Sequence, residues 1–426
     1  MSNGNSRSET SRYNRRSFLA ATGTAAVGAG VSTAGCIDAL TSEDIEGILI
    51  PGLYDLSGGT ADVGEPTAIG SRDAMKWINE NGDLENNLDH RWIDYEYEES
   101  EAQEHYDEYI GDDPPAIIGW GTADTELLAG DAAADEVVYI SASYSDELLD
   151  PDTDYNFFTN LDYTSKARAH IDWIADNDPD ATIAFIRNGT AFGTTPVAGG
   201  EAYAEEQGLD VAEEGGIELA LDASDADTEV SSAEDAGVDY LIHQNTGAPM
   251  EVLMSSVDSR GSDIDVMGLT WTVDEYRAAQ NDDIFEGVRY VNSNISFTEA
   301  KEDEPDGWEI IEDSFEREDR DMDDLEVANI NYVRGVTHTL LLAEAISLAE
   351  EDGDLDPYDG SDVREAMLML DDFDAWGLLV DTVDFRDDDR RPTMTGRMYV
   401  VEDGELNPEE DIELPRDEGW IPPFDF

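Results

Sequence analysis

Gly47-Ile-Leu-Ile-Pro-Gly-Leu53 is a short apolar run, and the segment from Pro66 to Asn81 follows it with a helical pattern. The apolar residues of that segment fall on one face, and Gly82 marks its end. A buried strand followed by an amphipathic helix is the repeating unit of a parallel sheet. This pair of segments therefore predicts an α/β fold.

The same unit recurs over the next 60 residues or so. Arg91 to Glu99 alternates apolar and acidic residues, which is the period of a half-buried strand. Ala116 to Trp120 and Glu136 to Ile140 are continuous apolar runs. Such runs are typical of strands that are covered on both faces of a parallel sheet.

A second block of the same kind begins near residue 181. Pro196 is expected to open a helix that Gly208 closes. The predicted strands of this block are Ala181 to Ile186, Leu209 to Val211, Val238 to Ile242 and Ile264 to Leu269. Two consecutive blocks predict two doubly wound parallel sheets, each with its own core.

The pattern changes beyond Gly287. A long apolar helix is predicted from about Val327 to Ala349, and a second helix after Ser361. Val383 to Phe385 and Met398 to Val401 are expected to be short strands. These remaining elements must pack back onto one or both sheets.

The first 35 residues are predicted to be a twin-arginine export signal. Arg15 and Arg16 precede a weakly apolar stretch that is too short and too rich in glycine to span a bilayer, which needs about 20 apolar residues. Thr33-Ala34-Gly35-Cys36 has the pattern of a lipobox. We expect residues 36–45 to be a linker on the outer face of the cell membrane, anchored there by a lipid.

Cys36 is the only cysteine of the chain. A lone thiol forms no internal disulfide, so the fold must depend on its hydrophobic core. We therefore expect Cys36 to be lipidated. Two acyl chains are expected, because a single chain binds a membrane only marginally.

The charge of the chain is extreme, with 103 acidic residues, 23 basic residues and a formal net charge of −80. Such a surface repels phosphate backbones, so the composition excludes nucleic-acid binding. Molar salt would screen the self-repulsion, and the composition resembles that of proteins from extreme halophiles. The 40% hydrophobic and 9% aromatic content argues against disorder, the competing interpretation of such acidity.

The sequence offers little support for catalysis. The five histidines show no metal-binding spacing, and neither a Gly-x-Ser-x-Gly elbow nor a phosphate-binding Gly-rich loop is present. Because acidic residues are so frequent in this chain, a pair of carboxylates gives no evidence for acid–base catalysis. We expect no metal and no cofactor, and an extracytoplasmic hydrolase is the disfavoured alternative.

Several landmarks occur in an order and spacing that resemble those of the leucine/isoleucine/valine-binding-protein family, the type I periplasmic binding proteins of ABC importers. They are Ile48 to Gly58, Gly70 to Asn79, Ile117 to Gly119, Tyr139 to Ser141, Ile183 to Ile186, Ala191 to Gly193 and Met398 to Gly404. The resemblance covers nearly all of the chain after the predicted signal.

This resemblance implies two lobes joined by three crossovers, with a small organic solute held in the cleft between them. One lobe would comprise residues 46–160 and about 293–390, and the other residues 161–292 and about 391–426. Such a protein acts as a monomer and delivers its solute to permease subunits in the membrane. A sensory receptor module of the same fold is the closest alternative, and the gene neighbourhood would separate the two.

The ligand site of an open parallel sheet lies beyond the carboxyl ends of its strands. The segments there are rich in glycine, hydroxyls, amides and aromatic rings, which suit a small-molecule site but also ordinary turns and helix caps. The candidate ligand-binding residues are Gly121, Thr122, Ala123, Ser141, Ser143, Tyr144, Phe192, Asn245, Thr246, Thr270 and Trp271.

One departure from the family pattern concerns the ligand. Amino-acid binders of the family carry a second-lobe carboxylate near the position of Thr270 and a Ser-Pro-x-Ala-Thr segment in the first lobe. In this chain, the position of the second-lobe carboxylate is occupied by Leu269-Thr-Trp271, and that of the first-lobe segment by Ser141-Ala-Ser-Tyr144. Asp274 would replace the carboxylate if its loop turned inward. Otherwise the ligand lacks an ammonium group, as amides, urea and aromatic acids do; a branched-chain amino acid is the other class that the resemblance suggests.

Overall fold

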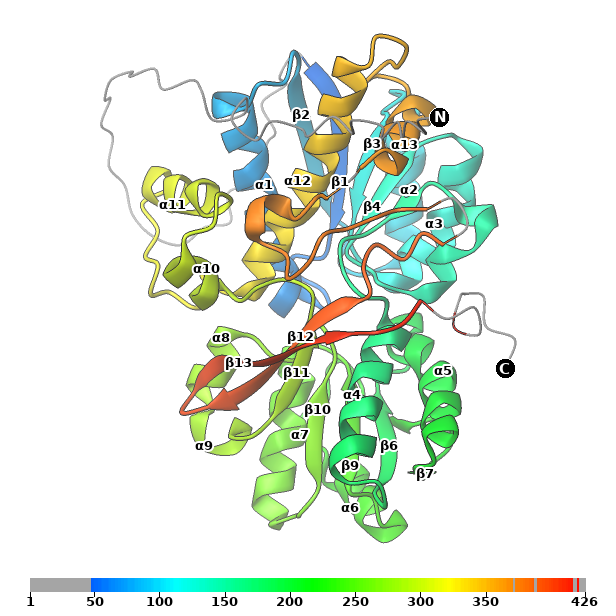
Figure 1. The fold of residues 1–426 in the computed structure, drawn as a ribbon, viewed down its shortest axis with the longest axis vertical. Helices are drawn as coiled ribbons and strands as arrows, with labels where there is room; N and C mark the ends of the chain where they lie inside the picture. The colour runs from blue at the N-terminus through cyan, green and yellow to red at the C-terminus, as the bar shows by residue number, and fades with distance from the viewer. Residues whose placement is uncertain (1–46, 371, 387–388, 417–419, 421–426) are drawn as a thin grey trace, which may run out of the picture.

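The computed structural model describes residues 47–370, 372–386, 389–416 and 420. It has two lobes, one above the other in Figure 1, and each lobe is built on its own sheet. Arg15, Arg16 and Cys36, on which the predictions of export and lipidation depend, lie outside the described residues. None of the described helices combines the length and the apolar character that a membrane span needs.

The first lobe contains a parallel sheet of five strands in the order β2-β1-β3-β4-β5. The strands are β1 (Gly47–Tyr54), β2 (Asn87–Asp94), β3 (Ala116–Gly119), β4 (Val138–Ser141) and β5 (Asn156–Phe157). Its helices are α1 (Ala61–Asn81), α2 (Glu99–Ile110), α3 (Thr122–Ala134), α10 (Phe297–Asp303), α11 (Trp308–Arg317), α12 (Ile330–Glu351) and α13 (Gly360–Leu368). The predicted parallel order is confirmed for this sheet.

The second lobe contains an eight-stranded sheet in the order β13-β12-β11-β10-β9-β6-β7, with β8 also paired to β6. The strands are β6 (Thr182–Arg187), β7 (Asp210–Val211), β8 (Ile217–Glu218), β9 (Tyr240–Gln244), β10 (Asp265–Gly268), β11 (Arg289–Asn292), β12 (Thr395–Glu402) and β13 (Glu405–Glu413). Its helices are α4 (Tyr163–Asn177), α5 (Ala191–Gln207), α6 (Asp227–Ala236), α7 (Gly247–Arg260), α8 (Glu275–Gln280) and α9 (Asp282–Phe285).

The predicted parallel sheet is confirmed for the strands from β6 to β11, but the antiparallel pairing at its edge was not predicted. The edge strands β12 and β13 form a hairpin, and β12 runs antiparallel to β11. Asp403 and Gly404 turn this hairpin with positive φ angles of 54° and 79°. The hairpin forms because a two-residue connection can join only antiparallel strands, whereas parallel neighbours need a long crossover.

The chain passes between the sheets three times. It leaves the first sheet after β5, returns from β11 to the first lobe through α10, and enters the second sheet again at β12. The three crossovers of the predicted fold class are therefore present. Figure 1 shows β12 and β13 at the waist between the two lobes.

Three boundary predictions were wrong. The helix predicted over Pro66 to Asn81 begins earlier, at Ala61. The strand predicted over Arg91 to Glu99 ends at Asp94, because Glu96 and Tyr97 have φ angles of 56° and 59°, in the left-handed region. The helix α5 begins at Ala191 rather than at Pro196. A proline inside a helix leaves the carbonyl four residues earlier without its donor. Here Gln244 Nε2 donates to Phe192 O at 2.8 Å and replaces the missing amide.

Val383 to Phe385 was expected to be a strand, but this segment forms only an isolated bridge from Val383 to Phe373. The elements predicted at the other strand positions and at α12 and α13 are confirmed, with shifts of a few residues at their ends. Five described elements were not predicted as strands: β5, β8, β11, β13 and the first part of β2.

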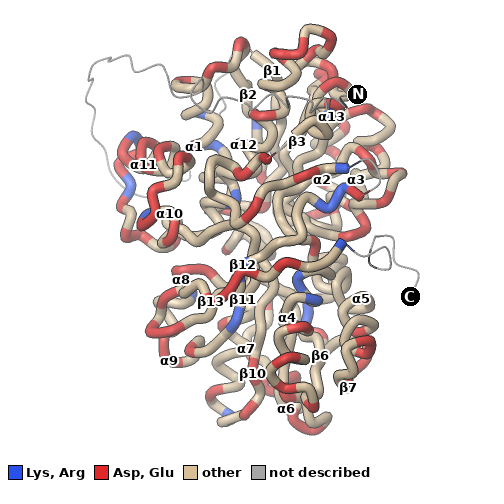
Figure 2. Tube along the Cα trace, in the orientation of Figure 1, with Lys and Arg blue, Asp and Glu red and all other residues tan. Residues whose placement is uncertain are grey.

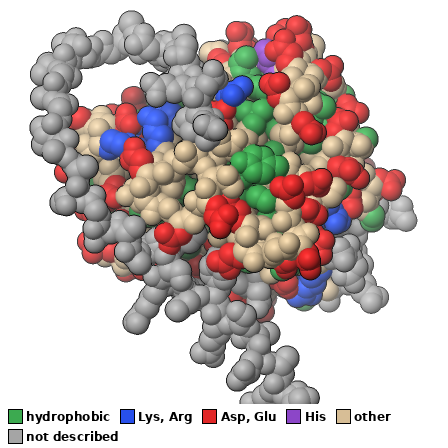
Figure 3. Space-filling model, turned by 90° about the horizontal axis from the view of Figure 1, so that it is seen from above, with side chains coloured by type: hydrophobic (Ala, Val, Ile, Leu, Met, Phe, Trp, Pro, Cys, Tyr) green, Lys and Arg blue, Asp and Glu red, His purple; other side chains and the backbone are tan. Residues whose placement is uncertain are grey.

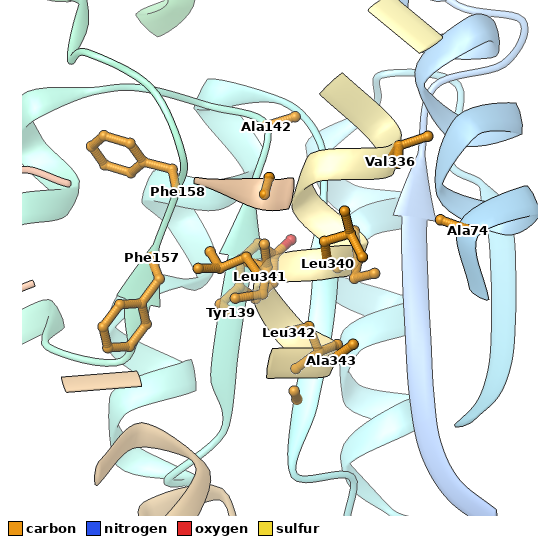
Figure 4. Close-up of a cluster of buried hydrophobic side chains, with 14 of the residues drawn as sticks. Ala74, Tyr139, Ala142, Phe157, Phe158, Val336, Leu340, Leu341, Leu342 and Ala343 are labelled. Atoms are coloured by element: carbon orange, nitrogen blue, oxygen red, sulfur yellow. The ribbon is translucent and has the colours of Figure 1, made fainter. Parts of the chain in front are cut away.

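The helix α12 is the centre of the first-lobe core. It lies beside α1 in Figure 1, and the two helices approach so closely that a Cβ at Gly335 would lie 1.9 Å from Thr67 O. Figure 4 shows Leu340 and Leu341 of this helix next to Tyr139 of β4. All three side chains are at most 2% exposed. Burial on nearly all sides explains why the α12 sequence is apolar around its whole circumference.

Acidic residues cover both lobes (Figure 2), and Lys and Arg are few among them. The end of the molecule formed by the first lobe carries many Asp and Glu side chains around a smaller apolar area (Figure 3). The charge is therefore a property of the surface, and the interior of each lobe is an ordinary apolar core.

Candidate ligand-binding site

A small pocket, called the cavity below, lies between the two lobes. The residues that line it are Thr60, Val63, Tyr97, Trp120, Gly121, Thr122, Ala142, Tyr163, Phe192, Thr246 and Trp271. Most of them lie within three residues of the carboxyl end of a parallel strand. The cavity thus occupies the place where the strand-end rule puts a ligand.

Five of the eleven predicted ligand-binding residues line this cavity. Gly121 and Thr122 come from the start of α3, while Phe192, Thr246 and Trp271 come from the second lobe. Sequence reasoning missed Thr60, Val63, Tyr97, Trp120, Ala142 and Tyr163 as lining residues. Applying the strand-end rule to β1 and β2 would have pointed to Thr60 and Tyr97, but no sequence signal distinguishes Tyr163.

The other predicted residues lie around the cavity without lining it. Ser143 Oγ donates to Thr122 Oγ1 at 2.9 Å, and the Ser143 amide donates to Ser141 Oγ at 2.8 Å. Asn245 Nδ2 donates to Leu219 O at 2.9 Å. Ala123 lies in the first turn of α3, and the carbonyl of Thr270 accepts a bond from Tyr290 at 2.8 Å. These residues shape the segments that carry the lining groups.

Asp55 organises the first-lobe wall. Its carboxylate accepts bonds from the amide and the hydroxyl of Thr60, both at 2.7 Å. The Trp120 indole in turn donates to Thr60 Oγ1 at 2.8 Å. Because the indole N–H is bonded within the protein, Trp120 presents an apolar ring to the cavity.

Trp271 joins the two lobes at the other side of the cavity. Its indole donates to Tyr163 Oη at 3.0 Å, and its ring lies 5.1 Å from the Trp120 ring in an edge-to-face arrangement. Tyr144 of the first lobe stacks on Trp271 at 5.7 Å with the two planes 6° apart. Both arrangements are favourable for aromatic pairs, so these rings hold the lobes together around the cavity.

A charged contact between the lobes lies at the rim of the cavity. Asp62 lies between the lining residues Thr60 and Val63, and its Oδ2 accepts a bond from the Ala248 amide of the second lobe at 2.9 Å. The same oxygen lies 3.5 Å from the guanidinium of Arg277, which also pairs with Glu251 at 2.6 Å. Burial raises the pKa of Asp62, while the Ala248 amide and Arg277 lower it.

Asp274, the possible replacement for the missing second-lobe carboxylate, does not line the cavity. Its Oδ1 accepts the Arg277 amide at 2.8 Å as the N-cap of α8, and its Oδ2 accepts Asn331 Nδ2 at 3.1 Å. Both oxygens are therefore engaged within the protein. Among the lining residues, none carries a formal charge.

Asp124 is a buried carboxyl group behind the first-lobe wall. Tyr95 Oη donates to its Oδ1 at 2.8 Å, and its Oδ2 has no hydrogen-bond partner among the described atoms. A Cβ at Gly121 would lie 2.2 Å from Oδ1, so glycine is required for this close approach. Burial raises the pKa of Asp124 to about 7. No group of His, Cys, Asp and Glu side chains suited to a metal ion occurs in the described parts of the chain.

Comparisons with known proteins agree with this geometry. The profile of a family described as "Periplasmic binding protein" matches residues 47–405. An ABC transporter substrate-binding protein of Aeropyrum pernix shares 26% identity and a TM-score of 0.79, over 87% of this chain and 96% of that one. None of the curated proteins compared with the chain matches it.

Two further solved structures are similar in fold. A branched chain amino acid ABC transporter protein of Thermus thermophilus, solved with bound valine, has 22% identity and a TM-score of 0.78, over 87% of this chain and 98% of that one. A fatty acid ABC transporter substrate-binding protein of Thermomonospora curvata has 16% identity and a TM-score of 0.74, over 87% of this chain and 93% of that one.

Proposed function

Because the chain belongs to the periplasmic binding protein family, we propose that it is the extracytoplasmic solute receptor of an ABC importer. The solute would occupy the cavity between the lobes and pass from there to permease subunits in the membrane. Family members and structural neighbours are solute-binding proteins rather than enzymes. The receptor acts as a monomer, since each lobe supplies its own half of the cavity.

The uncharged, ring-rich lining is the observation that supports the proposed ligand class. Five aromatic rings surround the cavity, and no lining side chain is acidic. An amino acid brings an ammonium group whose burial without a counter-charge is costly. The solute is therefore an amide, a urea-like compound or an aromatic acid, in preference to a branched-chain amino acid.

Contacts across the cavity explain how the solute would favour closure. Trp120 and Tyr97 belong to the first lobe, whereas Phe192 and Trp271 belong to the second. A ligand shifts the equilibrium towards the closed state only through contacts that are absent in the open one. A flat solute that touches rings of both lobes makes such contacts.

The leader is part of this proposal. Arg15 and Arg16 would direct export, Cys36 would carry the lipid, and the protein would be tethered to the outer face of the membrane. The variant Cys36→Ser is expected to appear in the medium, as measured by fractionation and immunoblotting. Retention of that variant in the membrane fraction would contradict the anchor without affecting the receptor assignment.

A ligand screen tests the receptor assignment directly. Thermal unfolding in molar KCl is recorded with amides, urea, aromatic acids and branched-chain amino acids. A ligand at 100 times its Kd is expected to add about 2.7 kcal/mol to the free energy of unfolding. Stabilisation by one class identifies the solute; stabilisation by none of them, together with turnover of a substrate, would refute the proposal.

A further inference from the structure

Two fully buried basic side chains, Lys166 and Arg334, pack against aromatic rings at the cavity. The Lys166 amine is 4.2 Å from the centre of the Tyr144 ring and 5.5 Å from that of Tyr163. The Arg334 guanidinium is 4.5 Å from the centre of the Trp271 ring. Both residues are 0% exposed. Tyr163 and Trp271 line the cavity, so each basic side chain contacts a ring of the lining without lining the cavity itself.

Neither cation has a carboxylate partner within the described part of the chain. Lys166 Nζ makes no hydrogen bond there. Arg334 donates to the Asn331 side chain, to Tyr290 Oη and, at 2.6 Å, to Thr270 O, all of them uncharged acceptors. Buried charges are normally paired, because an isolated one loses its hydration without compensation.

This arrangement is unexpected for this composition. The chain has 103 acidic residues and only three lysines, so acidic partners are abundant and a buried lysine is rare. Burial and the neighbouring Arg334 lower the pKa of Lys166, while Asp162 raises it. Local departures from good packing chemistry occur preferentially at functional sites. Asp274, which interacts electrostatically with Arg334, is the corresponding acidic neighbour of that residue. An anion in the cavity would favour the protonated form of Lys166 and add a counter-charge for Arg334.

We propose that Lys166 and Arg334 make the cavity selective for a carboxylate-bearing solute, although neither side chain touches it. They act as specificity-determining positioning residues through the Tyr144 and Trp271 rings. The proposal rests on the receptor function proposed above. It favours the aromatic acids over the amides and urea-like compounds named there, and it extends the ligand class to small aliphatic monocarboxylates. A buried charge keeps much of its influence in molar salt, because salt screens exposed charges far more than buried ones.

Matched acid and amide probes test the selectivity. Dissociation constants of benzoate, benzamide, 4-methylpentanoate and 4-methylpentanamide are measured by calorimetry in molar KCl. We expect each acid to bind the wild-type protein about tenfold more tightly than its amide, since a unit charge at several ångströms contributes on this scale at protein-like dielectric constants. This ratio requires no variant, so it decides the question even if a substitution impairs folding.

The variants Lys166→Met and Arg168→Met then show whether the preference for acids over amides depends on Lys166. Arg168 lies on the same helix, is 1% exposed and rests on the rings of Tyr203 and Trp420, away from the cavity lining. Lys166→Met should reduce the acid-to-amide ratio about tenfold, and Arg168→Met should leave it within about twofold. Loss of packing alone would weaken acid and amide equally, so the ratio distinguishes charge from structure.

Three outcomes would overturn the inference. Amides that bind the wild-type protein as tightly as acids would show that the cavity does not select a carboxylate, and the receptor function would stand. An unchanged ratio in Lys166→Met would remove that residue from the selectivity. Failure of every acid and amide to bind would contradict both this inference and the proposed solute class.

Discussion

The eleven residues that line the cavity carry no formal charge, whereas the whole chain carries a net charge of −80. Asp and Glu residues are spread along both lobes (Figure 2). The cavity, in contrast, is lined by aromatic rings, small residues and threonines. Surface charge influences solubility and the response to salt, while buried apolar area supplies binding free energy. The two regions should therefore respond to different perturbations.

The acidic surface and the uncharged lining meet at the rim of the cavity. There Asp62 contacts the Ala248 amide and Arg277, and the side chains of Asp62 and Arg277 are 17% and 15% exposed. This contact is charged like the surface and partly buried like the lining. It offers a way to change lobe closure without altering either region.

Dilution of salt is expected to produce the largest effect, because it acts on the entire surface. The Debye length increases from about 3 Å at 1 M to about 10 Å at 0.1 M, so repulsion among carboxylates grows. We expect far-UV circular dichroism to show unfolding on dialysis from molar KCl to low salt. Lowering the pH towards the sequence pI of about 4.1 should restore part of the signal. Full structure in neutral low-salt buffer would exclude the halophilic interpretation.

Trp271→Ala is expected to have the largest effect on the cavity alone. It removes a lining ring, its contacts with Trp120 and Tyr144, and its bond to Tyr163. We expect the affinity for the solute found in the screen to fall roughly a hundredfold, as for a central aromatic anchor. Calorimetry measures the affinity, and Trp173→Ala, which removes a second-lobe tryptophan outside the cavity lining, is the control. Equal loss in both variants would refute the assignment of the cavity.

Changes at the rim should have an intermediate effect. Asp62→Asn and Arg277→Met remove the ion pair between the lobes, so the open state gains population and the affinity falls about fivefold. Spin labels at Leu127→Cys and Glu205→Cys in a Cys36→Ser background would report the distance between the lobes. We expect a broader and longer distribution in both rim variants without solute.

Arg260→Met is the matched control for the rim. Arg260 pairs with Glu234 at 2.5 Å, and both residues belong to the second lobe. Loss of this pair should leave the distance between the lobes unchanged. If it widens the distribution as much as the rim variants do, the Asp62 contact has no special role in closure.

Glu344→Gln is expected to give the smallest effect. Burial, with Glu351 and Asp374 nearby, raises the pKa of Glu344 from 4.5 to about 7. Between these values the folded state binds the proton more tightly than the unfolded state, so the free energy of unfolding falls as pH rises. Glu344→Gln should add about 1 kcal/mol at pH above 7 and nothing near pH 4.

Chemical denaturation at both pH values in molar KCl measures this difference. Glu365→Gln removes an exposed carboxylate on α13 and provides the control for a general loss of negative charge. A similar gain from both variants would show that net charge, rather than the buried position of Glu344, determines the effect.

Most of the fold could be predicted from the sequence because its signals are local. Apolar runs such as Ala116 to Trp120 identify buried strands whatever lies beside them. Segment order then restricts the topology, since parallel strands need crossover connections. The antiparallel hairpin of β12 and β13 was missed because its acidic second strand lacks an apolar alternation.

The sequence by itself determined the α/β class, the acidic surface and the strand ends that carry Gly121, Thr122, Phe192, Thr246 and Trp271. Only the tertiary structure decided that Tyr163 lines the cavity, that Asp62 contacts Ala248, and that Lys166 and Arg334 pack against the Tyr144 and Trp271 rings. Asp62 and Ala248 are separated by 186 positions. Contacts between residues so distant depend on how two lobes pack together, and no local pattern of residues records that geometry.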